Sequence, residues 1–214
     1  MTVGASLRAA LRDFYDQSWR LLVLNTALTT AAIAIASLVF YTPLALALVL
    51  GLGPLAAALM HCAVTIVRED DLRLRDALVG LGLHWRRGFA LGLIGIAAPG
   101  LTVIAFGFYA GSGRLAWPLA VVVLYLAVLF AVYQLSLWPL AVFEREAPLR
   151  VVLLDAAVAL VRRPGASVGL AVTLFLVNLA GVVAALIPFF TLTIAYSFLA
   201  AAHFALPRDL APEA

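Results

Sequence analysis

The chain alternates between long uncharged apolar runs and short segments that hold nearly all of its charges. Each apolar run is about as long as the roughly 20 residues that an α-helix needs to cross the hydrocarbon core of a membrane. We therefore predict an all-α integral membrane protein, a six-helix transmembrane bundle. Its spans are predicted at about residues 21–40, 44–67, 89–109, 117–140, 167–187 and 189–206.

Turn-forming residues separate several of the predicted spans. Tyr41, Thr42 and Pro43 end the first span, and a Gly-Ser-Gly sequence at residues 111–113 separates the third from the fourth. The apolar region from 167 to 206 is too long for one helix, so we predict two spans that meet near Pro188. The last of these, 189–206, is the shortest and contains His203.

Four charged segments that flank or separate the apolar runs are predicted to lie on the cytoplasmic side, whereas the short turns after the first, third and fifth spans lie outside. The four cytoplasmic segments comprise an N-terminal helix (1–20), two inner loops (68–88 and 141–166) and a tail (207–214). In the first loop one helical stripe of apolar side chains predicts an amphipathic helix at the membrane interface; the stripe is Leu74, Ala77, Leu78, Leu81 and Trp85. In the second loop a helix from Leu149 to Arg163, preceded by Pro148, is predicted to lie deeper against the bundle.

Composition and charge support this interpretation. The chain is 65% hydrophobic and 12% charged, whereas about a quarter of a soluble domain is charged, and its length leaves no room for a soluble catalytic domain. All 14 basic residues are arginines, and with the N-terminus inside, 13 of them fall on the inner side and only Arg114 outside. This asymmetry predicts an N-in/C-in, multi-pass protein whose arginine-rich segments lie on the cytoplasmic side of its membrane. The arginines form no long run, so no nucleic-acid partner is expected.

The two inner loops share one plan, in which charged residues precede a helix, an Arg-Arg pair and a span. The second and third spans with their loop therefore resemble the fourth and fifth with theirs, which predicts a duplicated helical hairpin flanked by one helix at each end. The alternative is that any two cytoplasmic loops of a multispan protein share these features.

No predicted span contains Asp, Glu, Lys or Arg, which weakens the case for an ion-coupled pump but not for a channel or a neutral-solute path. Asn25, Gln134 and Asn178 are expected mainly to hydrogen-bond between helices. Gly53 and Pro54 interrupt the second span and are the first candidate for a binding site. With His61, these residues form the candidate solute path: Asn25, Gly53, Pro54, His61, Gln134 and Asn178.

Two common enzyme signatures are missing from the sequence. There is no HExxH or P-loop motif, and the single cysteine, Cys62, has no partner for a disulfide or a thiolate cluster. His61 and Cys62 are neighbours on a predicted helix and do not face each other, which disfavours a metal or nucleophilic role. We therefore expect no catalytic, metal or cofactor site.

Several short sequences together resemble the YesL-like family of bacterial membrane proteins. They are Asp13-Phe14-Tyr15, the Leu-Leu-Val-Leu-Asn of 21–25, the Gly53-Pro54 pair followed by small residues, and the Trp-Arg-Arg-Gly-Phe of 85–89. The resemblance covers about the first 90 residues. The chain departs from it at 77–79, where the family usually has an aromatic residue, and in carrying arginines in place of lysines.

This resemblance implies a small multispan inner-membrane protein with no assigned reaction. Because members are often encoded beside carbohydrate uptake systems of the ABC class, it also implies an accessory role in sugar import or its regulation.

We therefore expect a non-enzymatic accessory or regulatory protein whose inner helices contact an ABC-type carbohydrate transporter, another membrane protein or lipid headgroups. The arginines expected to make this contact are Arg73, Arg75, Arg86, Arg87, Arg162 and Arg163. Two alternatives remain open. These arginines could serve only to orient the chain, and the protein could be a small transporter or channel for a neutral or amphipathic solute. An enzyme ranks third.

Overall fold

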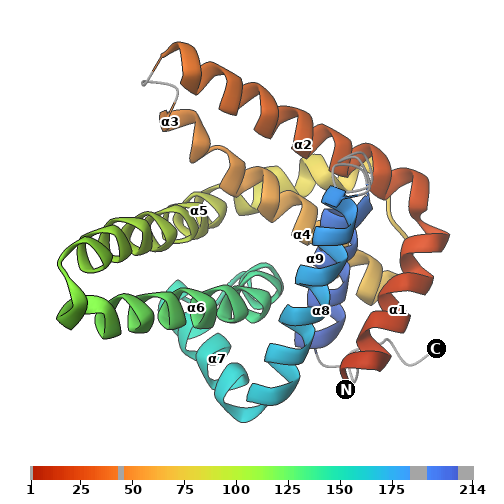
Figure 1. Ribbon diagram of the computed structural model, residues 1–214. Helices are drawn as coiled ribbons and strands as arrows, with labels where there is room; N and C mark the ends of the chain where they lie inside the picture. Colours follow the sequence, from red (N-terminus) through yellow and green to blue (C-terminus); the bar gives the residue numbers. More distant parts are fainter. Residues whose placement is uncertain (1, 43–45, 184–191, 207–214) are drawn as a thin grey trace.

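The computed structural model describes residues 2–42, 46–183 and 192–206, and every regular element in these ranges is helical (Figure 1). A short 3₁₀ turn, η2 (Arg114–Ala116), joins α5 to α6. The helices are α1 (Val3–Asp16), α2 (Ser18–Tyr41), α3 (Leu46–Val49), α4 (Leu52–Glu69), α5 (Leu74–Gly111), α6 (Trp117–Phe143), α7 (Leu149–Arg162), α8 (Pro164–Val183) and α9 (Ile194–Ala205). The prediction of an all-α protein is confirmed.

Five helical stretches are long and apolar enough to cross a membrane. They match the first five predicted spans and are Ser18–Tyr41, Ala47–Glu69, Leu74–Gly111, Arg114–Phe143 and Pro164–Val183. Two predicted turns are confirmed, because α2 ends at Tyr41 and α5 ends at Gly111, with Gly113 at a φ of 93° that favours glycine. The turn predicted near Pro188 and the tail at 207–214 lie outside the described residues.

The predicted sixth span differs from the other five. Its helix, α9, has 12 residues, which is about 18 Å of helix against a hydrocarbon core of about 30 Å. It packs against α1, α4 and α6, and its side chains from Leu199 to His203 are buried. By contrast, few side chains of α2, α5 and α6 are buried. The last helix is therefore a central packing element of the described structure.

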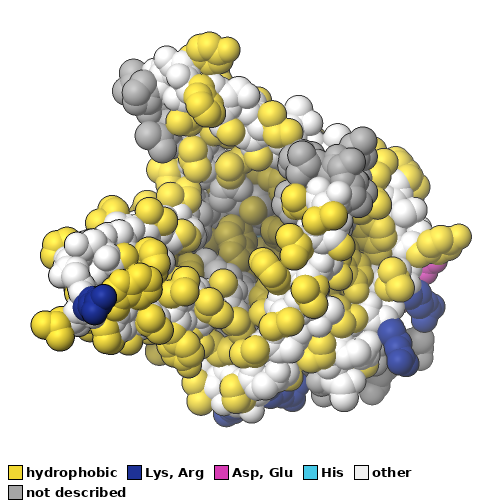
Figure 2. Space-filling view, viewed as in Figure 1, with side chains coloured by type: hydrophobic (Ala, Val, Ile, Leu, Met, Phe, Trp, Pro, Cys, Tyr) yellow, Lys and Arg dark blue, Asp and Glu magenta, His cyan; other side chains and the backbone are white. Residues whose placement is uncertain are grey.

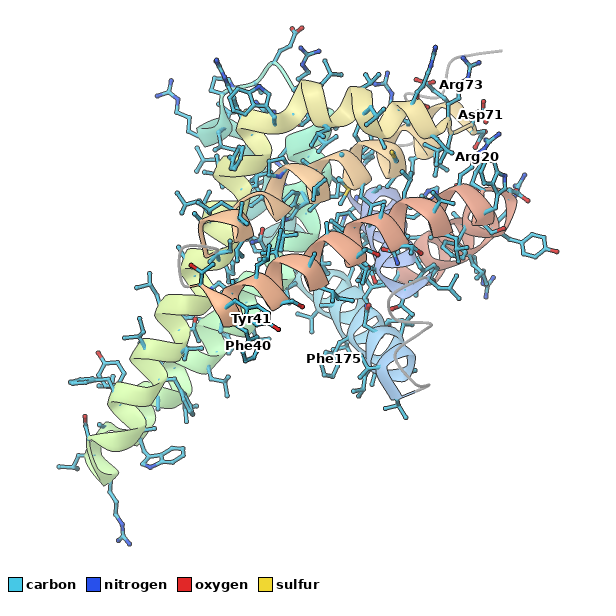
Figure 3. The ribbon with its side chains drawn as sticks, turned by 90° about the horizontal axis from the view of Figure 1, so that it is seen from above. Arg20, Phe40, Tyr41, Asp71, Arg73 and Phe175 are labelled. Carbon is cyan, nitrogen blue, oxygen red and sulfur yellow. The ribbon has the colours of Figure 1, made fainter. Side chains whose placement is uncertain are left out.

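The first inner loop also differs from its prediction. The helix expected at 74–85 and the third span form one continuous helix, α5, of 38 residues, about 57 Å long. Figure 3 shows its first part (yellow) running across the arginine-bearing end of the molecule and its second part (green) turning away. In the second loop α7 is a separate helix, as predicted, because Pro164 begins α8 immediately after Arg163. The two hairpins thus differ in their loops, and their duplication stays a prediction.

The apolar surfaces are spread over diverging helices. α5 and α6 lie side by side as one arm, and α2 and the α8–α9 pair point in other directions (Figure 1). Figure 2 shows a hollow between these three parts, lined mainly by hydrophobic side chains. Such a large apolar exterior is expected where lipid replaces water as the solvent.

Candidate functional site

Five of the six arginines that the sequence singles out are exposed: Arg73, Arg75, Arg86, Arg162 and Arg163. They come from the start of α5 and from the end of α7, and the guanidinium of Arg86 lies 5.2 Å from the centre of the Trp85 ring. The turn that carries Arg114 lies at the far tip of the α5–α6 arm (Figure 1). The five exposed arginines on α5 and α7 can therefore contact phosphates or carboxylates of other molecules.

Arg87 is used inside the protein. Its Nη1 donates to the backbone oxygens of Ala141 and Glu144, each at 2.7 Å, and its Nη2 donates to the backbone oxygen of Ala147. The last carbonyls of an α-helix have no donors within their own helix, so this guanidinium caps the C-terminus of α6 and the turn that leads to α7. Arg87 is therefore engaged within the protein and joins α5 to α6, unlike the five arginines that are exposed.

The loop between α4 and α5 is tied to the start of α2. Arg20 Nη1 donates to Asp71 Oδ1 at 2.8 Å, and Asp71 also accepts from the backbone N–H of Leu72 at 2.8 Å. The Arg20 hydrogen bond first, and the Leu72 N–H second, lower the pKa of Asp71. The backbone N–H of Arg73 donates to Asp76 Oδ2 at 2.7 Å and caps the start of α5. Figure 3 shows Arg20, Asp71 and Arg73 together at this corner.

The Gly53-Pro54 break marks the closest crossing of two helices. Pro54 is the third residue of α4, where its missing N–H costs no helical hydrogen bond. A Cβ added to Gly53 would lie 2.3 Å from the Gly88 oxygen and 2.9 Å from the Gly92 Cα, and one added to Gly88 would lie 2.6 Å from the Pro54 Cα. The two backbones are in direct contact and leave no space for a ligand there. This favours close packing over the binding-site hypothesis for Gly53 and Pro54.

Asn178 joins α8 to α9. Its Nδ2 donates to Ser197 Oγ at 2.8 Å and to the Leu174 oxygen at 2.7 Å, and its Oδ1 accepts from Thr193 Oγ1 at 3.0 Å. This is the hydrogen bonding between helices expected of an amide in a membrane bundle.

The other two amides lie elsewhere. Asn25 is fully buried on α2, and Gln134 on α6 faces Gly95, whose added Cβ would lie 3.6 Å from its Nε2. Three pockets, of about 710, 320 and 190 Å³, are lined mainly by apolar side chains, and none of the three is lined by Asn25, Gln134 or Asn178. None of these three pockets therefore forms a solute path lined by Asn25, Gln134 and Asn178.

His61 has a partner that sequence reasoning missed. Its ring centre lies 5.2 Å from that of His84 on α5, where Gly80 leaves space for the His61 ring, and His84 is 3% exposed. His84 lies three residues after Leu81, which places it near the apolar stripe of α5. Its contact with His61 on α4 could not be inferred from the sequence. In the described part of the chain, His, Cys, Asp and Glu side chains form no group of three that could hold a metal ion.

The N-terminal helix is clamped onto the last one, which sequence reasoning also missed. His203 Nε2 lies 2.7 Å from Asp13 Oδ2, and both side chains are largely buried. Tyr196 donates its hydroxyl to the Leu7 oxygen at 3.2 Å and packs edge to face against Phe14. Because the two residues lie 190 positions apart in the sequence, no local pattern predicts this contact.

The exposed arginines can bind anionic groups. No protein-family model, curated protein or solved structure matches the chain, so its resemblance to the YesL-like family stays a prediction.

Proposed function

We propose that this multi-pass membrane protein is a non-enzymatic accessory or regulatory partner of a transport system in the bacterial inner membrane. The observation that carries the proposal is the exposure of five arginines on α5 and α7, on a molecule that also exposes many large hydrophobic side chains. Guanidinium groups form bidentate contacts with carboxylates and phosphates, so these residues suit an acidic protein surface or lipid headgroups. From the family resemblance, we propose an ABC-type carbohydrate transporter as the partner.

The same proposal includes an N-in/C-in topology, with the arginine-rich helices at the cytoplasmic interface and residues 189–206 making the return crossing. The Asp13–His203 contact supports it, because it brings the end of α9 back to the N-terminal helix. A periplasm-sensitive reporter fused after Arg114 should be active, and one fused after Arg163 should be inactive. The opposite pattern would contradict this topology.

The partner contact can be tested with arginine variants. Replacing Arg73, Arg75, Arg86, Arg162 and Arg163 by glutamine should abolish co-purification of the sugar transporter from native membranes and reduce uptake of labelled sugar in the host. Arg114→Gln, at the other end of the molecule, is the matched control and should change neither. If the wild-type protein enriches no transporter and deletion of its gene leaves sugar uptake unchanged, the proposal is wrong.

A small transporter or channel for a neutral or amphipathic solute is the second candidate. The hydrophobic hollow in Figure 2 favours it, while the dispersed positions of Asn25, Gln134 and Asn178 do not. Solute flux through proteoliposomes that contain only this purified protein would favour the transporter over the accessory role.

A further inference from the structure

One face of α1 stays exposed after the helix has packed against α9. Its residues are spaced by three or four positions, and they combine two arginines, Arg8 and Arg12, with Leu11 and Tyr15, which are 61% and 81% exposed. Trp19, at the start of α2, is 57% exposed. Arginine mixed with aromatic and aliphatic side chains is typical of a helix that lies in the membrane interface, where aromatic rings sit at headgroup level.

An apolar groove of about 320 Å³ opens beside this face, between α1, α8 and α9. It is lined by Leu11, Phe14, Val177, Leu192, Thr193 and Tyr196. The hydroxyl groups in this lining already hydrogen-bond within the protein: Thr193 donates to Asn178 Oδ1, and Tyr196 donates to the Leu7 oxygen. The groove therefore suits a hydrocarbon chain better than a polar solute.

We propose that this groove binds an acyl chain of an anionic glycerophospholipid whose phosphate contacts Arg8 and Arg12. The two arginines flank Leu11, which lines the groove, so one lipid would meet the charges with its headgroup and the groove with its chain. α1 exposes these two arginines against one exposed acid, Asp16, so the face is complementary to an anion. A second copy of the protein is a poorer occupant, because a symmetric contact would bring the arginines of both copies together.

This lipid site is separate from the arginines proposed to contact a transporter, which lie on α5 and α7. The lipid-site proposal can therefore be tested independently of the proposed accessory function.

The test uses phosphatidylglycerol with a photoreactive group in its acyl chain, added to the purified full-length protein in detergent, with cross-links mapped by mass spectrometry. Cross-links should concentrate on the peptides that contain Leu11 and Val177. Unlabelled phosphatidylglycerol should compete, and phosphatidylcholine should compete weakly. This competition needs no variant. Cross-links spread evenly over the exposed faces of α2 and α6, or equal competition by the two lipids, would overturn the proposal.

Two variants separate the headgroup from the chain. Arg8→Gln/Arg12→Gln should weaken phosphatidylglycerol binding by about 25-fold, since each arginine near an anionic lipid contributes about fivefold. The matched double variant Arg162→Gln/Arg163→Gln should leave labelling of the groove unchanged. Val177→Trp fills the groove and leaves both arginines in place. It should abolish labelling of the groove. Unchanged labelling in Arg8→Gln/Arg12→Gln, or a covalent dimer joined through α1, would contradict the proposal.

Discussion

Replacing Gly53 by alanine should force α4 and α5 apart at their closest crossing. The added Cβ would lie 2.3 Å from the Gly88 oxygen, whereas ordinary contacts begin at 3.4 Å, so the helices must separate by about 1 Å. Overpacking of this kind costs about 1–3 kcal/mol, and the helical preference for alanine over glycine returns about 0.5–1 kcal/mol. We expect the free energy of unfolding to fall by about 1–2 kcal/mol.

The measurement is equilibrium unfolding in mixed dodecyl maltoside and dodecyl sulfate micelles, followed by the loss of helical circular dichroism. Gly82→Ala is the control: it lies on α5 and an added Cβ there would have nothing within 4 Å, so this change should leave stability equal or raise it by up to about 1 kcal/mol. Gly88→Ala should behave like Gly53→Ala, because its Cβ would meet Pro54 at 2.6 Å. Equal unfolding free energies for Gly53→Ala and Gly82→Ala would refute the close crossing.

Four further predictions follow from contacts between helices. Arg87→Ala should lower the free energy of unfolding by about 2–3 kcal/mol, because three carbonyls at the end of α6 and in the turn to α7 lose a charged donor, and Arg87→Lys, which lacks the fork of donors, should recover only part of it in the same micelle assay. Asn178→Leu should cost about 1 kcal/mol, the ordinary value of an interhelical hydrogen bond in a membrane protein, and a loss above about 3 kcal/mol would point to a different role. His203→Ala should cost about 1–3 kcal/mol, because it leaves the largely buried Asp13 carboxyl without its hydrogen-bond partner, and Asp13→Asn/His203→Gln should cost less than His203→Ala; equal losses would argue against this contact. The lowered pKa of Asp71 should appear as a carboxyl titration midpoint below the usual value in a nuclear magnetic resonance experiment, and its contribution to stability should be present above the unfolded-state pKa and disappear as the pH falls through the folded-state pKa; a normal midpoint would contradict its contact with Arg20.

The His203–Asp13 clamp also bears on the proposed functions. It joins the first and last described helices, and the groove proposed for a lipid lies between these helices and α8. Loss of the His203–Asp13 contact should therefore lower the stability of the protein and also weaken phosphatidylglycerol labelling of the groove. The arginines on α5 and α7 would stay in place, so contact with a transporter should be less affected.

The membrane class, the first five apolar helices and the turns at Thr42 and 111–113 could all be predicted from the sequence. Each depends on a local property: a helix in lipid must be apolar over about 20 consecutive residues, and turn residues interrupt it. The helix that follows Pro148 is local in the same sense and was predicted as well.

Only the tertiary structure decided which apolar segments face outward and which lie inside. Hydropathy cannot separate α9, packed centrally, from an outward-facing span such as α2, because lipid and protein interior are both apolar. The same limit applies to Arg87, which capped a helix 54 or more positions away, and to Gly53, whose lack of a side chain matters only because Gly88 lies opposite. These roles depend on which distant residue lies within a few ångströms, and that proximity is a property of the folded chain and not of any local pattern.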